Sequence, residues 1–365
     1  MNNVRGGCVR VMILTADYAP GSWSGIGVAV ERQARALASL GIETHVLVAN
    51  RAIDMPGASG TGPHVHQLSR QRCPVDPRQF DVVHLHSLAL SELAEELRRR
   101  FDLPLVYTAH SLLRLELQES ADAGLWCAVQ ERILTISDGV VFLSRAERLA
   151  AVAGAPELAT RSYVIPNGVP APPDSLPPPE EEGPIVFAGR FARSKGVELL
   201  GQLIPRVLAR WPGRFVLAGG HGDTAGTRIV QNIAAQFPGA CRVPGWLNRN
   251  DLDALFAASA VVLVPSRYEP FGLVALEAMR AGAPVLAAGV GGLTEVVAPE
   301  SGGRLVYSRD PEVWCRALLE IVSTPAVREA LRRRGPQYVK AHFDSTRMAE
   351  RLVAEVYSAC AAGRA

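Results

Sequence analysis

The sequence predicts an α/β protein built from two doubly wound parallel sheets. Short apolar, β-branched runs alternate with segments of helical periodicity along nearly all of the 365 residues. The alternation stops once, at residues 170–184, where seven prolines and three glutamates indicate an extended linker. A chain of this length with 48% hydrophobic residues is long enough for two domains, which we place at 1–169 and 185–344.

The first domain is expected to hold six strands joined by helices. The strands are predicted at 9–15, 44–49, 65–68, 81–86, 105–108 and 140–143. The helices are predicted at 26–40, 90–100 and 125–136, with a further helix that begins at Arg145. The strands are short and apolar and each helix segment keeps apolar residues on one face, which is the pattern of a parallel sheet covered on both sides.

The second domain repeats this order after the linker. The predicted strands are 185–188, 215–218, 241–243, 260–265 and 285–287, and the predicted helices are 197–210, 224–237, 251–258 and 273–279. The tail from Glu312 onward is expected to be helical, with Gly335-Pro336 as its one break. Asp251-Leu252-Asp253 follows Asn248 at a helix start, so we interpret it as helix capping and not as a metal-binding motif.

Composition excludes several classes of function. The formal charge of +2 gives no reason to expect nucleic acid as the main partner. Six cysteines without metal-ligand spacing suit a reduced, cytoplasmic environment. No run approaches the roughly 20 apolar residues of a membrane-spanning helix, and no signal peptide is convincing, so we expect a soluble protein. His84 and His86 share one strand face, but without a third ligand we expect packing, and no metal or other cofactor.

The stretch 266–277 is the most informative part of the chain. Glu269 lies in the loop after an apolar strand, and Glu277 lies about two turns into the following helix. One interpretation is that Glu269 caps the helix and Glu277 is an exposed helix charge. Gly272 allows a ligand to approach the backbone, however, and apolar neighbours surround Glu277. A buried carboxylate needs hydrogen-bond donors, which sugar or ribose hydroxyls supply.

A second constellation opens the second domain. Gly189-Arg190 and Lys195-Gly196 enclose a loop before a helix, so two cations lie near a helix N-terminus, an arrangement suited to a diphosphate. A basic surface loop is the alternative. In the first domain, Gly25-Ile26-Gly27 lies too far after its strand for the dinucleotide fingerprint. His110 follows a strand at the edge where open α/β sheets bind ligands, although a lone histidine is often structural.

EPFGLVALEAMRAGAPV, residues 269–285, resembles the E-x7-E signature of the retaining glycosyltransferases of family 4. This family has the GT-B fold, in which two Rossmann-like domains face a cleft and a C-terminal helix, here about 345–362, packs back on the first domain. The resemblance implies that Glu269 holds the hydroxyls of the donor sugar and Glu277 the ribose. The backbone of Phe271, Gly272 and Leu273 would approach the diphosphate and the sugar.

Other segments match further elements of the same family. The G-R-x4-K-G match implies that Arg190 and Lys195 stabilise the departing nucleoside diphosphate, and the T-x-H match makes His110 the active-site histidine. Arg193 occupies a variable position of that loop. The remaining implied donor contacts are Gly25, Gly27, Gly219, Trp246, Leu247 and Arg267.

The resemblance implies a metal-independent hexosyltransferase. It would move a hexose from a nucleoside diphosphate to a hydroxyl of a small-molecule, glycan or lipid-linked acceptor. UDP is favoured over GDP as the donor nucleotide. The implied mechanism is front-face displacement with retention of configuration. The acceptor loops 51–63 and 112–123 carry no signature that identifies the acceptor. The alternatives are a sugar-nucleotide epimerase of the same fold, a nicotinamide-dependent dehydrogenase and a non-catalytic nucleotide-sugar binder.

Overall fold

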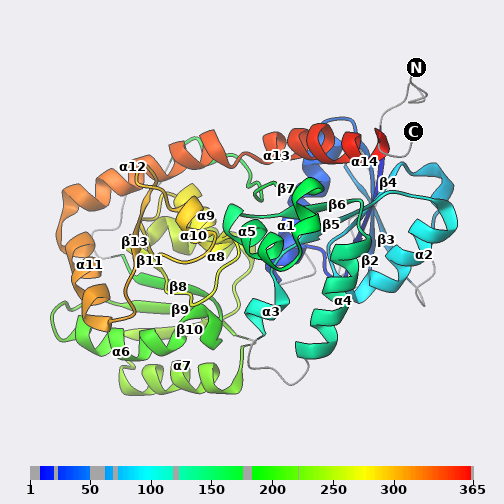
Figure 1. Ribbon diagram of the computed structural model, residues 1–365. Helices are drawn as coiled ribbons and strands as arrows, with labels where there is room; N and C mark the ends of the chain where they lie inside the picture. Colours follow the sequence, from blue (N-terminus) through cyan, green and yellow to red (C-terminus); the bar gives the residue numbers. More distant parts are fainter. Residues whose placement is uncertain are drawn as a thin grey trace. The chain divides into compact units, whose positions relative to one another are not determined.

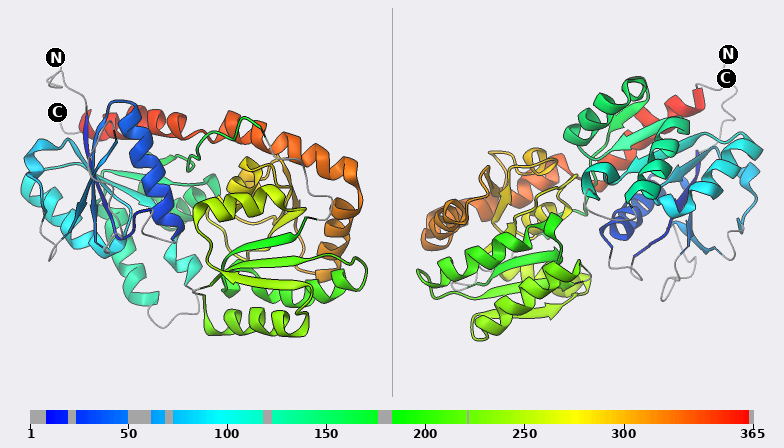
Figure 2. Two further views of the ribbon diagram at one scale, coloured as in Figure 1. Left: turned by 180° about the vertical axis from the view of Figure 1, so that it is seen from behind. Right: turned by 60° about the horizontal axis from the view of Figure 1, so that its bottom comes forward.

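The computed structural model describes residues 9–19, 24–49, 62–68, 73–117, 123–175, 183–220 and 222–362. The chain forms two compact units, the N-terminal unit of Met1–Pro170 with Asp344–Ala365 and the C-terminal unit of Ala171–Phe343. Each unit contains one parallel sheet with helices on both faces, which confirms the predicted fold class (Figures 1 and 2). Part of the predicted linker, residues 176–182, lies outside the described residues.

The N-terminal unit has a seven-stranded sheet in the order β3-β2-β1-β4-β5-β6-β7. The strands are β1 (Arg10–Thr15), β2 (Glu43–Val48), β3 (His64–Gln67), β4 (Val82–Leu85), β5 (Leu105–Ala109), β6 (Gly139–Phe142) and β7 (Ser162–Val164). The helices are α1 (Gly25–Ser39), α2 (Ser91–Phe101), α3 (Leu113–Glu116), α4 (Ala123–Ile136), α5 (Arg145–Gly154), α13 (Ser345–Arg351) and α14 (Ser358–Ala362), with the π-helical segment Leu352–Tyr357 between the last two.

Alternating residues of β1 face two separate apolar clusters, because successive side chains of a strand point to opposite faces. Met12 and Leu14 pack in the cluster that holds apolar residues of α2, α4 and α5. Val11 and Ile13 pack in the cluster formed with α1 and the C-terminal helices. The segment from Met348 to Cys360 therefore completes the core of the N-terminal unit.

The C-terminal unit has a six-stranded sheet in the order β10-β9-β8-β11-β12-β13. The strands are β8 (Ile185–Arg190), β9 (Phe215–Gly220), β10 (Cys241–Gly245), β11 (Val261–Val264), β12 (Val285–Ala288) and β13 (Gly303–Val306). The helices are α6 (Val197–Leu208), α7 (Thr224–Gln236), α8 (Arg249–Ala258), α9 (Leu273–Arg280), α10 (Leu293–Val296), α11 (Pro311–Ser323) and α12 (Pro325–His342).

The structure corrects three expectations. The short strands β7 and β13 were not predicted, and α3 forms where a loop was expected. Gly335-Pro336 does not break the tail, because α12 runs through it and the breaks fall at Thr324 and at Phe343-Asp344. A Cβ on Gly335 would lie 2.8 Å from the carbonyl oxygen of Met279. The glycine is thus required by close packing of α12 on α9, not by a chain reversal.

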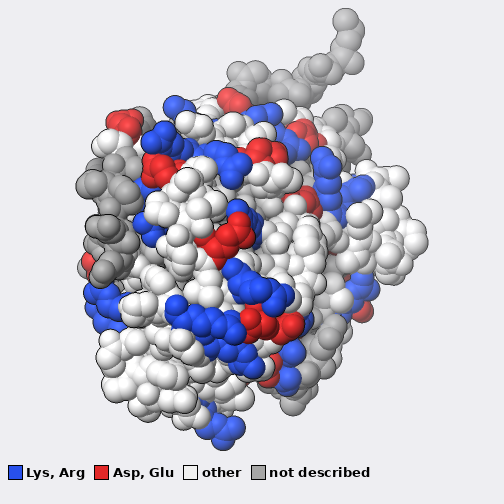
Figure 3. All heavy atoms as spheres, turned by 90° about the vertical axis from the view of Figure 1, so that its left-hand side faces the viewer, with Lys and Arg blue, Asp and Glu red and all other residues white. Residues whose placement is uncertain are grey.

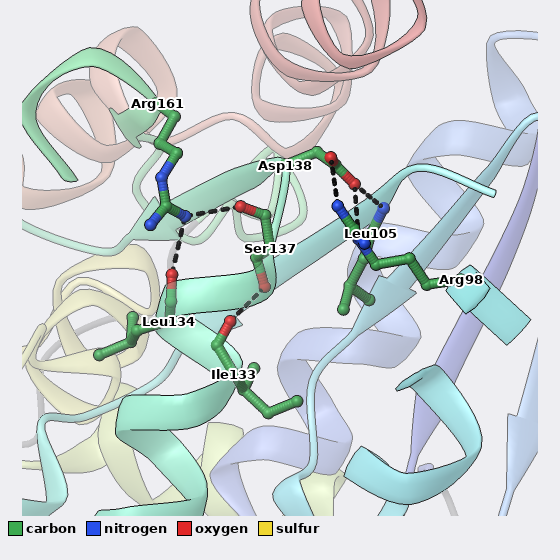
Figure 4. Close-up of polar contacts among 7 residues, drawn as sticks. All are labelled: Arg98, Leu105, Ile133, Leu134, Ser137, Asp138 and Arg161. Carbon is green, nitrogen blue, oxygen red and sulfur yellow. Dashed lines mark hydrogen bonds and ion pairs between the residues drawn. The ribbon is translucent and has the colours of Figure 1, made fainter. Parts of the chain in front are cut away.

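The edge of the N-terminal sheet where β5 and β6 begin is fixed by Asp138 (Figure 4). Its carboxylate accepts two hydrogen bonds from Arg98, at 3.1 and 3.2 Å, and one from the backbone N–H of Leu105, at 2.8 Å. Next to it, Nη1 of Arg161 donates to the carbonyl oxygens of Leu134 and Ser137 and so caps the C-terminus of α4.

The surface carries charges of both signs. On the face drawn in Figure 3, Lys and Arg side chains lie beside Asp and Glu side chains and form no broad region of one sign. Within the described part of the chain, every helix falls short of the length or the apolar character needed to cross a bilayer.

Candidate active site

The predicted diphosphate loop and the predicted sugar loop meet in the C-terminal unit. They follow β8 and β11, which are neighbours in the sheet, so both loops leave the same sheet edge. Nζ of Lys195 donates to Oε2 of Glu269 at 2.8 Å, and Oγ of Ser266 donates to the same oxygen at 2.9 Å. Ser266 is buried, and the side chains of Lys195 and Glu269 are 24% and 12% exposed. The sequence analysis did not identify Ser266.

Close backbone contact holds these two loops together. The N–H of Arg267 donates to the carbonyl oxygen of Ser194 at 2.7 Å. Gly196 has φ +77°, and a Cβ there would lie 1.9 Å from the carbonyl oxygen of Pro265. Only glycine fits this position, which explains the Lys-Gly pair of the sequence.

A third loop supports Glu269 from its other side. The N–H of Gly292, after β12, donates to the carbonyl oxygen of Glu269 at 2.9 Å. Helix α9 begins after Gly272, which has φ +104°, so Gly272 and not Glu269 is its N-cap. The helix-capping interpretation of Glu269 is therefore wrong. Phe271 and Gly272 are buried and Leu273 is partly buried at this start of α9.

Glu277 is buried, with 4% of its surface exposed, and forms an ion pair. Nη1 of Arg249, at the start of α8, donates to its Oε1 at 2.6 Å. The interpretation of Glu277 as an exposed helix charge is thus wrong. Arg249 was missed by sequence reasoning, since nothing in the sequence links it to a residue 28 positions away.

The arginines around the diphosphate loop have different surroundings. Arg190 is the exposed last residue of β8. Arg193 and Arg267 are both exposed and both pair with Glu198, at 2.8 and 3.2 Å. Arg267 therefore lies at the predicted edge, and its described side-chain partner is a carboxylate of α6.

The remaining predicted donor contacts follow the neighbouring strands β9 and β10. Gly219 has φ +146°, and a Cβ there would lie 1.8 Å from the carbonyl oxygen of Gly189. Trp246 and Leu247 follow β10 and are partly buried. A Cβ on Gly220 would lie 3.1 Å from Nε1 of Trp246, so the indole approaches the end of β9. His221, in the predicted nucleotide-side loop, lies outside the described residues.

In the N-terminal unit, Gly25 and Gly27 lie in the first turn of α1. The Ser24 hydroxyl caps this helix by accepting from the N–H of Gly27 at 2.9 Å. His110 follows β5, and β1, β4 and β5 are parallel neighbours, so α1 and His110 follow the same sheet edge. Burial lowers the pKa of His110 to about 4 although its ring keeps some exposure.

His84 and His86 are buried and make specific hydrogen bonds. Nδ1 of His86 lies 3.0 Å from Nε2 of His110, and Nε2 of His84 lies 2.7 Å from the hydroxyl of Thr108. No group of three or more His, Cys, Asp or Glu residues in the described ranges is arranged to hold a metal ion. The capping interpretation of the D-x-D segment is confirmed, because the Asn248 side chain accepts from the N–H of Asp251 at 2.9 Å.

Two doubly wound α/β units, with polar side chains at the carboxyl ends of their parallel strands, define a class of protein that binds its ligands at those strand ends. The family model described as Glycosyltransferase Family 4 matches residues 23–171, and that described as Glycosyl transferases group 1 matches residues 171–338. The chain belongs to the family 4 glycosyltransferases and has their GT-B fold.

Relatives support this assignment over nearly the full chain. The D-inositol 3-phosphate glycosyltransferase of Thermobispora bispora is 28% identical over 96% of this chain and 94% of its own. The structure of sucrose-phosphate synthase from Thermosynechococcus elongatus is 26% identical, covers 94% of this chain and 97% of its own, and has a TM-score of 0.76. HepE of Anabaena, in complex with UDP and glucose, is 17% identical over 94% of this chain and 98% of its own, with a TM-score of 0.74, and shows the shared fold. The chain is a hexosyltransferase-type glycosyltransferase.

Proposed function

We propose that the protein transfers a hexose from a nucleoside diphosphate to an acceptor hydroxyl, with retention of anomeric configuration and without a metal. The observation that carries this proposal is the contact of Lys195 with Glu269, where the ends of β8 and β11 meet. A cation for the departing diphosphate and a carboxylate for sugar hydroxyls are then held at the one position where the bond between sugar and phosphate must break.

Each polar side chain has one role in this mechanism. Arg190 and Lys195 stabilise the negative charge that grows on the diphosphate as the bond breaks. Glu269 accepts hydrogen bonds from the sugar, since a carboxylate offers about four acceptor sites and Lys195 and Ser266 use part of that capacity. Glu277, oriented by Arg249, holds the ribose. The departing phosphate oxygen takes the proton of the acceptor on the same face of the sugar, so no carboxylate forms a covalent intermediate.

We propose UDP as the donor nucleotide in preference to GDP. Uridine is the commonest donor base in the family, and the solved HepE complex contains UDP and glucose on the same fold. For the acceptor, the D-inositol 3-phosphate glycosyltransferase and the sucrose-phosphate synthase suggest phosphorylated polyols and sugars by their names. These compounds join glycans and lipid-linked sugars as candidates. The five described cysteines are free thiols, in keeping with the cytoplasm as the proposed location.

A donor and acceptor screen tests this function. UDP- and GDP-hexoses are combined with inositol phosphates, hexose phosphates and glycans, and release of the free diphosphate is measured by ion-exchange chromatography. We expect the diphosphate to be released only when an acceptor is present, and activity to be complete in EDTA. NMR of the product should show the same axial or equatorial anomeric bond as in the donor. An inverted product, or activity restored only by Mn²⁺ or Mg²⁺, would contradict the mechanism. Conversion of the donor to an epimer without an acceptor would contradict the function.

A further inference from the structure

A buried chain of hydrogen bonds connects His110 to the interior of the N-terminal unit. His110 contacts His86, and Nε2 of His86 lies 3.2 Å from Nε2 of Gln33 on α1. The same amide nitrogen lies 3.2 Å from Nδ1 of His84. Gln33, His84 and His86 are each at most 5% exposed, so protein groups alone determine these bonds.

The direction of every bond in this chain follows from the amide. An amide nitrogen carries two N–H donors and no acceptor. Gln33 therefore donates to His86 Nε2, so that this ring nitrogen must be unprotonated, and the amide nitrogen cannot accept from His84 Nδ1. The single lone pair of His84 Nδ1 accepts from the nearer hydroxyl of Tyr357, 2.7 Å away, so His84 carries its proton on Nε2 and donates to Thr108.

The tautomer of His86 in turn determines that of His110. Because Nε2 of His86 accepts, its proton is on Nδ1, 3.0 Å from Nε2 of His110. His86 thus donates to His110, whose own proton must lie on Nδ1. Burial keeps all three rings neutral, since it lowers the pKa of His84 to about 3 and the pKa of His86 well below its usual value.

We propose that Gln33 and His86 are positioning residues that fix His110 as the neutral tautomer with its proton on Nδ1, so that His110 acts as a hydrogen-bond donor and not as an acid or a base. The assignment of the tautomer stands on these contacts and on the burial of the rings, which keeps them neutral. Its use toward the donor sugar rests on the proposed function. In the proposed mechanism the departing phosphate receives the proton of the acceptor, so no side chain is needed as a base. A histidine that only donates a hydrogen bond suits this mechanism, because it does not compete for that proton.

The first test uses the unmodified protein. Long-range ¹H–¹⁵N correlation spectra of ¹⁵N-histidine-labelled enzyme distinguish Nδ1–H from Nε2–H rings, and single His→Gln variants assign the signals of His84, His86 and His110. We expect Nε2–H for His84 and Nδ1–H for His86 and His110. An Nε2–H ring at His110 would overturn the proposal whether or not the enzyme is a glycosyltransferase.

The second test reverses the polarity of the chain. A carboxylate only accepts hydrogen bonds, so Gln33→Glu should draw the His86 proton to Nε2 and force His110 to the Nε2–H tautomer. We expect kcat to fall about 10-fold or more, the usual effect of changing a residue that orients another residue of the site. KM for the donor should change little. The matched control is Gln231→Glu, the same change at an exposed position of α7.

A tautomer switch at His110 with unchanged kcat would remove its role in the reaction and leave the tautomer assignment intact. If Gln33→Glu folds, as judged by circular dichroism, and His110 stays Nδ1–H, the proposal fails.

Discussion

Nζ of Lys195 and Oε2 of Glu269 lie 2.8 Å apart, although 74 residues separate them in the chain. Their loops leave adjacent parallel strands at the same edge, and Gly196 and Gly292 allow the backbones to approach. The pair connects the part of the site assigned to the leaving group with the part assigned to the sugar.

Loss of either cation should slow the chemical step. Lys195→Ala and Arg190→Ala are each expected to lower kcat by about 10²–10³-fold, with a smaller change in donor KM, because their interaction strengthens as negative charge develops. Steady-state kinetics with donor and acceptor varied separately measure this. Arg193→Ala, in the same loop and paired on the surface with Glu198, is the control and should be nearly silent.

The contact between Lys195 and Glu269 also predicts non-additive effects. The double variant Lys195→Ala, Glu269→Ala should lose less activity than the product of the two single losses, because each single change leaves the other charge without its partner. Independent losses, or a rise in KM with kcat preserved in either cation variant, would show that these side chains only bind the ground state.

Substitution of Glu277 and of Glu269 should affect nucleotide affinity differently. Glu277→Ala is expected to weaken UDP and UDP-hexose binding alike, whereas Glu269→Ala should spare UDP and impair turnover. Calorimetric titration with UDP measures the difference. The melting temperature of each variant is recorded as a control, because Glu277→Ala leaves Arg249 without its buried partner. Equal loss of UDP affinity in both variants would refute the division of roles.

Acid should destabilise the N-terminal unit through its buried histidines. The pKa values of His84, His86 and His110 lie below the usual 6.5 in the folded protein, so the unfolded chain binds more protons and stability falls as the pH drops below about 6.5. Three such groups imply a loss of about 3–4 kcal/mol between pH 6 and pH 5.

Urea unfolding at several pH values, followed by circular dichroism, tests this dependence. In a His84→Gln variant the unfolding free energy should depend less steeply on pH, by the equivalent of one proton, since Gln does not titrate. A variant with the same slope as the original protein would show that His84 is protonated in the folded state.

Asp138 should matter for stability and not for turnover. Asp138→Ala removes the acceptor of the Leu105 N–H and of Arg98, which should cost about 1–3 kcal/mol of unfolding free energy. The residue lies at the sheet edge opposite His110, so kcat should be unchanged. The control is Glu96→Ala, which removes an exposed ion pair with Arg100 and should lower the unfolding free energy by much less than Asp138→Ala. A fall in kcat without a fall in stability would contradict this assignment.

Much of the site could be predicted because it depends on local patterns. A buried strand followed by a polar loop and a helix identifies the sheet edge, and two such edges on neighbouring parallel strands place Lys195 near Glu269. The same rule placed His110 at the corresponding edge of the other unit, whereas Gly27 was expected there from the family resemblance. The parallel sheets followed from the alternation of strands and helices alone.

The parts that were missed depend on tertiary contacts. Arg249 meets Glu277 only because α8 packs on α9, and Gln33 meets His86 only because α1 covers β4. Gly335 carries the usual signal for a helix end, yet it serves contact between helices. The glycine pair Gly291-Gly292 after β12 was a usable signal for a third loop at the site, since glycines after a strand mark close backbone approach.

The return of residues 344–362 to the N-terminal unit has a consequence for biosynthesis. Met348, Leu352 and Val356 lie in the same apolar cluster as Val11 and Ile13 of the first strand. A ribosome therefore makes β1 long before it makes the helices that cover this strand. The C-terminal unit, continuous from Ala171 to Phe343, has all its residues before the N-terminal unit does. Until those helices are made, one apolar face of the N-terminal sheet is incompletely covered, so this unit is the one that chaperones are expected to bind during synthesis.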